Sequence, residues 1–339
     1  MPVPHRNLIT DVPGLKVGNA EDTAIRTGVT VLLPDEPAII GVDVRGGAPG
    51  TRETDALDPT SLVEHGHAVV LSGGSMYGLD AASGVAAWLG ARGIGFTGFA
   101  PDAPPVMLVP AAILFDLGNG GDKAWGDTPP YRDLGLKACE AAADHFDLGN
   151  AGAGFGATAG TYKGGLGSAS EITGAGISVG AIAGVNPVGS PVMPGTQAFW
   201  AWPHEVAGEF GGLRPPDGWQ MPDTLPADTK LGAPLAPGQS TIIGAVATDA
   251  ALTKSEATRL ANMAHAGIAR AVWPSHTLMD GDTIFCLSVG SKPLPEPRAV
   301  ALSWLGARMA SCMARAIARG VWEAESLGDA PSIRKISGG

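Results

Sequence analysis

Charged residues and cysteines are scarce in this sequence, and it contains neither a basic run nor a long apolar run. Charged residues make up 16% of the 339 residues, and the net charge is −11. Without a cluster of lysines and arginines, nucleic acid and anionic membrane surfaces are poor partners. No apolar stretch reaches the roughly 18 residues that span a bilayer, and the first residues include no apolar signal segment. We therefore expect a soluble, cytoplasmic protein.

The three cysteines, Cys139, Cys286 and Cys312, share no spacing typical of a metal site, and an odd number does not fit a disulfide framework. We expect buried, inert thiols. Small and apolar residues are abundant instead: 45% of the chain is apolar and 50 residues are glycine. The glycines gather in clusters, which indicates tight turns and close approach of backbone segments. The low charge also favours burial of surface between subunits.

Short apolar runs bounded by Gly, Pro or Asp predict buried strands in the first half of the chain, and segments rich in small residues predict helices. The predicted strands cover residues 27–33, 38–44, 67–72 and 176–186, and the predicted helices cover residues 75–92 and 132–146.

Residues 190–238 have little periodicity and are rich in Pro, Gly, Asp and Trp, which predicts a loop longer than compact domains normally contain. A strand is predicted to begin at Thr241. A helix follows, because Thr253 and Glu256 match a capping box. Another strand at 283–289 and a long helix at 298–324 complete the chain. The order strand, helix, strand, helix predicts a layered α/β fold.

Thr241 stands where the long loop meets the predicted strand. Taken alone, it is an ordinary first residue of a strand. A second interpretation is that its hydroxyl attacks the carbonyl of Ser240, so that an N-to-O acyl shift and hydrolysis free an α-amine. Such an amine has an unperturbed pKa of ~7.7–8.0, which suits a general base for the neighbouring hydroxyl.

Other candidate residues each have a plain alternative. Asp280 and Asp282 flank a glycine before a strand and could orient an ammonium or hydroxyl group. They could also bind a divalent ion or form a simple acidic turn. Asn186 could stabilise an oxyanion or form an Asn-Pro turn. Lys163, among glycines, could be catalytic or a solvated loop lysine.

Three glycine-containing segments suggest anion or nucleotide binding. Residues 45–55 hold two arginines among turn residues and could clasp a carboxylate. Residues 73–78 precede a predicted helix and could cradle an anion. Residues 152–157 loosely imitate a dinucleotide fingerprint, but the glycine-rich sequence that follows predicts more loop rather than an amphipathic helix. We therefore do not expect a nucleotide cofactor.

Taken together, several stretches of the chain resemble the P1 family of peptidases, classified as peptidase family S58. This family includes L-aminopeptidase/D-esterases, β-peptidyl aminopeptidases and 6-aminohexanoate-oligomer hydrolases. The resemblance rests on LITDVPGLKVGNA, VDVRGGAPGTRETDALDP, LSGGSMYGLDAASGV, AAILFDL, YKGGLGSAS, VNPVG, STIIGAVATDAALTK and HTLMDGDTIF.

The resemblance implies an α/β fold, a four-layer α-β-β-α sandwich. Its architecture is similar to that of N-terminal-nucleophile (Ntn) hydrolases but with a different connectivity, as in ornithine acetyltransferase. It implies one catalytic domain, residues 1–339, processed into an α chain (1–240) and a β chain (241–339). It further implies a homo-oligomer, commonly a tetramer. No metal and no cofactor are expected.

The resemblance also implies residue roles. Counted back from Ala247-Thr248-Asp249, the family spacing places the nucleophile at Thr241. Ser240 stands where relatives often have Asn, so it is the runner-up nucleophile and borders the substrate. The family pattern further assigns an oxyanion role to Asn186, a catalytic lysine to Lys163 and a catalytic carboxylate pair to Asp280 and Asp282; Tyr77 is expected to border the substrate pocket.

The expected function is a self-processing aminopeptidase or amidohydrolase that acts on short peptides, amides or esters. An endo-type hydrolase of amide oligomers is one alternative. An uncleaved relative that only binds small ligands is another, and a metal- or nucleotide-dependent enzyme is a third.

Overall fold

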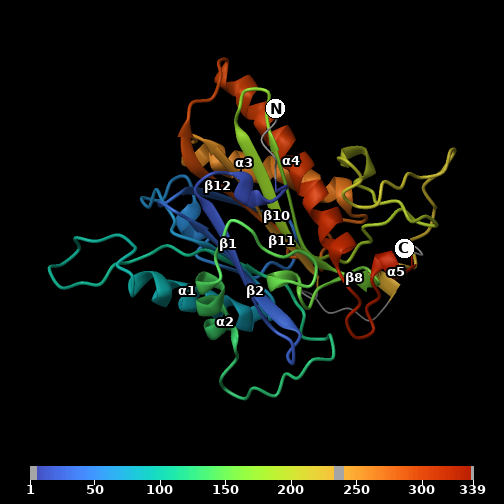
Figure 1. Cartoon of the computed structure of the whole chain (residues 1–339), viewed down its shortest axis with the longest axis horizontal. Helices are drawn as coiled ribbons and strands as arrows, with labels where there is room; N and C mark the ends of the chain where they lie inside the picture. Colours follow the sequence, from blue (N-terminus) through green and yellow to red (C-terminus); the bar gives the residue numbers. More distant parts are fainter. Residues whose placement is uncertain (1–5, 233–239, 337–339) are drawn as a thin grey trace.

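The computed structural model describes residues 6–232 and 240–336, in which two five-stranded sheets lie face to face between two pairs of helices (Figure 1). The first sheet has the order β1 (Leu15–Asp22), β2 (Thr27–Pro34), β5 (Val69–Ser72), β6 (Ala111–Ile113) and β4 (Thr51–Arg52). The second has the order β3 (Ile39–Val44), β12 (Thr283–Lys292), β11 (Thr241–Ala250), β10 (Ser178–Asn186) and β9 (Gly165–Ile172).

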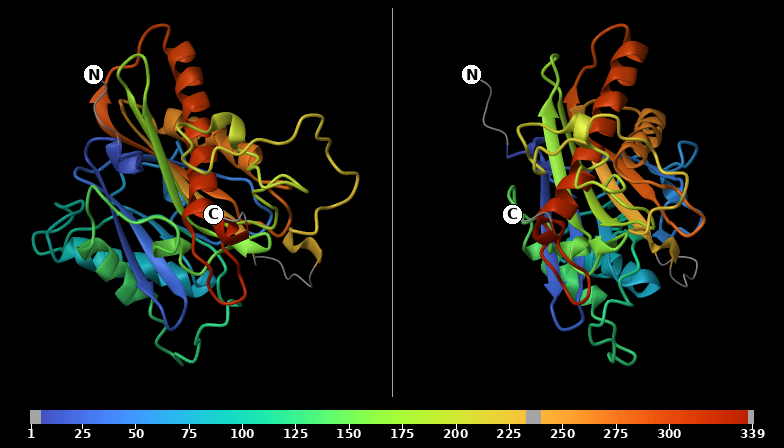
Figure 2. Two further views of the ribbon diagram at one scale, coloured as in Figure 1. Left: turned by 45° about the vertical axis from the view of Figure 1, so that its right-hand side comes forward. Right: turned by 90° about the vertical axis from the view of Figure 1, so that its right-hand side faces the viewer.

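Helices cover the outer face of each sheet. Helices α1 (Ala81–Gly90) and α2 (Tyr131–Glu140) pack on the first sheet, and α3 (Lys254–Ala271) and α4 (Arg298–Glu323) pack on the second. The long helix α4, in red, runs beside β9 and β10 (Figure 2). The short helix α5 (Ile333–Ile336) and the two-stranded ribbon β7 (Thr158–Ala159) and β8 (Tyr162–Lys163) lie outside these layers.

Strand β11 shows why the sequence forms these layers. Every residue of the strand is buried. Ile243 and Ala245 join the core between the two sheets, whereas Ile242 and Val246 join the core under α3 and α4. Side chains alternate between the two faces of a strand, so a continuous apolar run indicates a strand covered on both sides. Each large aliphatic side chain buried in this way contributes about 1.5–3 kcal/mol.

The predicted strands and the helices at 254–271 and 298–323 are present, but two helix predictions need correction. Residues 75–80 form a 3-10 helix before α1 rather than α-helix. Helix α2 ends at Glu140 instead of reaching residue 146. The chain leaves the helix there because Ala143 exchanges two backbone hydrogen bonds, of 3.1 and 3.0 Å, with Val17 at the edge of the first sheet.

The prediction of a continuous glycine loop after residue 157 is also wrong, because β9 begins at Gly165. In that strand the glycines allow α4 to approach closely. A Cβ on Gly167 would lie 1.9 Å from the carbonyl oxygen of Ala316, and one on Gly165 would lie 2.2 Å from that of Gly320. The described part of the chain contains no helix with the length and hydropathy that a membrane span requires.

Candidate active site

The pairing of the second sheet brings three predicted segments together. Strands β11 and β12 are parallel, with Ile243 opposite Thr283, so the residues that precede the two strands also lie side by side. Ser240 accordingly forms a parallel bridge with Asp280. Strand β10 is antiparallel to β11 and places Asn186 opposite Thr241.

The Thr241 hydroxyl lies against the peptide bond that precedes it. Its Oγ1 donates a hydrogen bond to the carbonyl oxygen of Ser240. The amide of Gly281 donates to that carbonyl oxygen and to Thr241 Oγ1, each at 3.1 Å. Ser240 and Thr241 are both buried. The Thr241 hydroxyl, the peptide bond that precedes it and a backbone donor to the carbonyl oxygen of that bond are therefore in contact.

Asp282 links the start of β11 to a histidine. Its Oδ1 accepts a hydrogen bond from the amide of Ile242 at 2.8 Å, and its Oδ2 lies 2.7 Å from His276 Nδ1. His276 has a φ of 54°, in the left-handed region that residues other than glycine seldom adopt. Such backbone conformations gather at functional sites. The sequence prediction did not assign a role to this histidine.

Asp280 holds the loop before β12 in place. Its Oδ1 accepts from the amide of Val188 at 3.0 Å, and its Oδ2 accepts from Thr277 N at 3.0 Å and Thr277 Oγ1 at 2.6 Å. Burial, and then the nearby charge of Asp282, raise the pKa of Asp280. The carboxylate thus joins the end of β10 to the segment that faces Thr241.

The Asn186 side chain is held at both ends. Its Oδ1 accepts hydrogen bonds from Thr158 N at 2.9 Å and Lys230 Nζ at 3.2 Å, and its Nδ2 donates to the carbonyl oxygen of Phe115 at 3.0 Å. A rigid amide whose NH₂ group is the donating end is what an oxyanion hole requires.

The contacts of Lys163 and Tyr77 are with other parts of the chain. Lys163 is buried, and its Nζ donates to the carbonyl oxygens of Gly154 and Gly164 at 3.0 and 2.7 Å. Burial lowers the pKa of Lys163 to about 7, opposed by the charge of Asp116. Tyr77 is exposed and packs edge-on against another aromatic ring, that of Trp125. Their catalytic and pocket roles stay predictions.

A cavity of about 310 Å³ adjoins Asn186, and its lining includes two charged residues to which the sequence reasoning gave no role. Its lining consists of Phe115, Asp116, Gly118, Asn119, Gly156, Thr158 and Lys230. Lys230 comes from the long loop, where no sequence pattern singled it out. Asp116 belongs to the AAILFDL motif, so that motif was an available signal.

Asp116 is buried, and burial raises its pKa to about 6. Its two oxygens accept hydrogen bonds of 2.7 Å from Gly74 N and from Thr27 Oγ1. The glycine segment 73–78, predicted to cradle an anion, thus holds the carboxylate of the protein's own Asp116.

The arginine segment after β3 also contacts the site. Arg45 Nε donates to the carboxylate of Asp43 at 2.6 Å, so the predicted carboxylate clasp is made with a neighbouring residue. The backbone of the same segment packs on the loop before β12, because Arg45 N donates to the carbonyl oxygen of Asp282 at 2.9 Å and Ala48 N donates to that of Asp280 at 2.8 Å.

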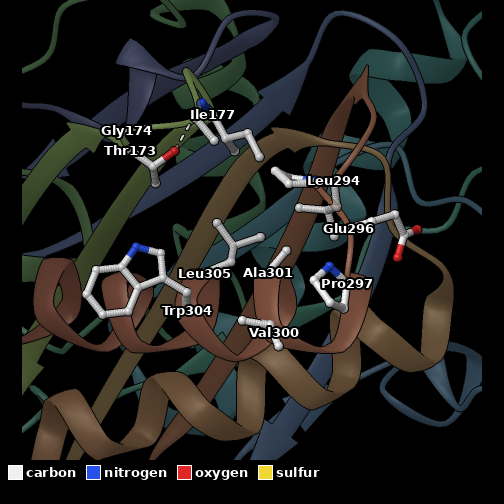
Figure 3. A pocket seen from close by; sticks show the side chains of 12 residues that line it. Thr173, Gly174, Ile177, Leu294, Glu296, Pro297, Val300, Ala301, Trp304 and Leu305 are labelled. Atoms are coloured by element: carbon white, nitrogen blue, oxygen red, sulfur yellow. Dashed lines mark hydrogen bonds between the residues drawn. The ribbon is translucent and has the colours of Figure 1, made fainter.

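A separate pocket of about 260 Å³ lies between the β9–β10 turn and the start of α4 (Figure 3). Its lining is mostly apolar and includes Ile177, Leu294, Val300 and Trp304. Ile177 precedes the first residue of β10 and Asn186 is the last, so at ~3.3 Å per residue the strand separates the two sites by about 30 Å. This pocket is not part of the catalytic centre.

Comparisons with known proteins show which family the chain is similar to. The model of peptidase family S58 matches residues 7–332. A Mycobacterium tuberculosis protein named as an uncharacterized aminopeptidase is 40% identical, covering 97% of this chain and 98% of its own. The 6-aminohexanoate-oligomer endohydrolase of a Kocuria species is 31% identical, covering 84% of this chain and 76% of its own.

Among solved structures, the L-aminopeptidase D-Ala-esterase/amidase of Ochrobactrum anthropi superposes with a TM-score of 0.70 at 22% identity, covering 96% of this chain and 88% of that one. That structure is described as a new variant among the Ntn hydrolase fold. The predicted four-layer, Ntn-hydrolase-like architecture is thereby confirmed.

The fold and the family match define the class of protein: an aminopeptidase-type hydrolase of peptide or amide bonds on an Ntn-hydrolase-like fold. The chain belongs to peptidase family S58.

Proposed function

We propose that this peptidase cuts itself between Ser240 and Thr241 and then uses Thr241 as an N-terminal nucleophile. The observation that carries the proposal is the Thr241 hydroxyl held against the Ser240 carbonyl under the amide of Gly281. In the cut, Thr241 Oγ1 bonds to the Ser240 carbonyl carbon and the peptide C–N bond breaks, giving an ester and a free α-amine. Water then hydrolyses the ester and leaves chains 1–240 and 241–339.

In the second reaction, Thr241 Oγ1 attacks the carbonyl carbon of a substrate amide or ester while the freed α-amine accepts the hydroxyl proton. Asn186 Nδ2 stabilises the oxyanion of the tetrahedral intermediate. The leaving group takes the proton as the C–N or C–O bond breaks. Water hydrolyses the resulting Thr241 ester and regenerates the enzyme.

Asp280 and Asp282 hold the loop and the start of β11 in this arrangement. Asp282 contacts the residue after the nucleophile and is placed to orient the new α-amine. Lys163, buried with a pKa lowered to about 7, would act at longer range by adding positive charge beneath the glycine loop. Tyr77 is proposed to border the substrate entrance.

The cavity beside Asn186 supports aminopeptidase action on short substrates. At about 310 Å³ it is at the small end of the range for ligand pockets, and its lining includes one buried carboxylate, that of Asp116. A carboxylate in a cavity beside the proposed oxyanion donor can pair with the free N-terminal ammonium of a peptide, amide or ester. The relative named as an amide-oligomer endohydrolase favours a second candidate, in which the substrate amine is not required.

A denaturing gel with intact-mass analysis tests the first part. Wild type is expected to give fragments of 240 and, by subtraction from 339, 99 residues, with threonine at the new N-terminus. Thr241→Ala is expected to stay intact and inactive. A new N-terminus at Ser240 would identify that residue as the nucleophile instead. The proposal is refuted if wild type stays intact and Thr241→Ala has the same activity as wild type.

A substrate panel tests the second part. Aminoacyl p-nitroanilides, D-amino esters, β-peptides and aminohexanoate oligomers are compared with their N-acetylated forms. Aminopeptidase action predicts hydrolysis of the free amines only. Equal rates on the acetylated forms would favour the endohydrolase.

We also propose that the chain is a cytoplasmic homotetramer. The apolar pocket of Figure 3 supports burial between subunits, because Val300 is 64% exposed and Trp304 is 60% exposed. Light scattering coupled to size exclusion measures the assembly, and Trp304→Glu is expected to reduce it. A monomeric wild type would contradict the proposal.

A further inference from the structure

Lys230 approaches the candidate active site from the long loop that precedes Thr241. Its Nζ lies 3.2 Å from Asn186 Oδ1, 3.2 Å from the Asn186 carbonyl oxygen and 3.4 Å from Ser240 Oγ. Its own backbone is anchored, because Lys230 N donates to the carbonyl oxygen of Val188 at 2.9 Å. The side chain therefore starts from a fixed point and ends on Asn186 and on Ser240, the residue before Thr241.

The contacts with Asn186 determine which way its amide faces. A backbone N–H and a protonated lysine are donors only, so the atom that meets Thr158 N and Lys230 Nζ must be the amide oxygen. The NH₂ group is then the donating end. A positive charge on the oxygen side also polarises the amide, which strengthens the hydrogen bonds that Nδ2 donates.

We propose that Lys230 is a positioning residue of the active site: its ammonium fixes and polarises the Asn186 amide as an oxyanion donor. This inference rests on the oxyanion role proposed above for Asn186. Lys230 acts through Asn186 and takes no proton from the substrate.

The charge of Lys230 depends on its surroundings. Burial lowers the pKa of Lys230 to about 7, and the negative charge of Asp280 opposes this shift. Asp116, on the segment after β6, lines the same cavity. The ammonium form is present below the pKa and is lost as the pH rises through it. Activity that needs the ammonium is therefore expected to fall on the alkaline side.

Lys230→Met and Lys230→Arg separate this role from simple packing. Methionine keeps the length of the side chain and removes the charge, whereas arginine keeps the charge at every accessible pH. Lys137→Met, at an exposed position on α2, is the matched control. The measurement is kcat and KM from pH 5 to about 10 on protein whose cleaved fraction has been determined by gel.

Removal of a direct oxyanion donor costs roughly 10²–10³-fold in kcat, so the indirect effect of Lys230→Met is expected at roughly tenfold, mainly in kcat. Lys230→Arg is expected to retain activity and to lose the alkaline fall. The inference would be overturned if cleaved Lys230→Met kept the wild-type kcat and the wild-type fall in activity at alkaline pH. It would also be overturned if Lys230→Arg showed the same fall at alkaline pH as wild type.

Two outcomes remain distinguishable from failure of the proposed function. If Lys230→Met folds, as judged by its unfolding temperature, but stays uncut while wild type is cut, Asn186→Ala decides the cause. An uncut Asn186→Ala supports the inference, whereas a cut Asn186→Ala overturns it, because Lys230 then acts on Ser240 directly. If wild type itself stays uncut and Thr241→Ala is as active as wild type, the proposed function fails, whatever the result for Lys230.

Discussion

The amide of Gly281 donates to two oxygen atoms of the neighbouring strand end, the Thr241 hydroxyl and the Ser240 carbonyl, each at 3.1 Å. One donor thus contacts both the oxygen that we propose as the nucleophile and the oxygen that would become an oxyanion. The parallel register of β11 and β12 produces this geometry, and it holds only while the loop before β12 keeps its path.

Gly281→Ala is therefore expected to block self-cleavage. A Cβ at this position would lie 2.6 Å from the carbonyl oxygen of Ala48 and 2.9 Å from Thr241 Oγ1, so the loop must shift. Loss of such a donor slows related steps roughly 10²–10³-fold. The fragment yield over time on a denaturing gel measures the effect. Gly174→Ala, where a Cβ meets nothing within 4 Å, is the control; equal cleavage in both variants would contradict the role of Gly281.

His276 is expected to hold Asp282 in the orientation that catalysis needs. His276→Gly removes the ring without straining the positive φ, and kcat should fall roughly tenfold, because a hydrogen bond to a charged group contributes about 1.5–3 kcal/mol. His276→Asn tolerates the same φ and can still donate to Asp282, so it should stay close to wild type. The double variant with Asp282→Asn should lose little beyond Asp282→Asn alone. Equal losses in the Gly and Asn variants would exclude the hydrogen bond as the cause.

Protonation of the Asp116 carboxyl group should weaken the binding of substrates with a free amine at acid pH. Burial raises its pKa to about 6, so the carboxylate that would attract an ammonium is present above this pH and is lost as the pH falls through it. KM for aminoacyl p-nitroanilides should rise below pH 6, and Asp116→Asn should show a high KM at every pH. The pH dependence of KM measures this. An unchanged KM in Asp116→Asn would remove Asp116 from substrate binding.

The capping box of α3 should stabilise the fold without affecting chemistry. Thr253 Oγ1 accepts from Glu256 N at 3.3 Å, and Glu256 Oε2 accepts from Thr253 N at 2.8 Å. Thr253→Ala should lower the free energy of unfolding by about 1 kcal/mol. Chemical denaturation of the uncut Thr241→Ala background measures it, with Ser303→Ala on α4 as the control. A loss of activity per folded molecule would show an unexpected link to the site.

Much of the second sheet could be predicted from the sequence, because its strands are continuous apolar runs and α3 begins at a recognisable capping box. Strand β9 could not. Its glycines are typical of a loop in the sequence. In the structure they are required because the backbone of α4 lies within 2.2 Å of where a Cβ would be on Gly165 or Gly167. That constraint comes from a helix more than a hundred residues further along the chain.

The site shows the same limit. The resemblance to the family led us to expect Asn186, Thr241 and Asp280 close together, and the strand register explains why they are. Lys230 carries no pattern, since it lies in an irregular loop and matters only because the loop returns to Val188. His276 was visible beside the two aspartates, but its left-handed backbone was not.

The strand order has a consequence for the history of each molecule. Strands β11 and β12 lie in the centre of the second sheet, with β10 on one side and β3 on the other. A cut before Thr241 would leave the two central strands on one fragment and their neighbours on the other. The fragments could then separate only by unfolding, and an unfolded pair would have to find each other again by diffusion. Such a protein folds once as a single chain, and afterwards its lifetime depends on how slowly it unfolds rather than on how readily it refolds.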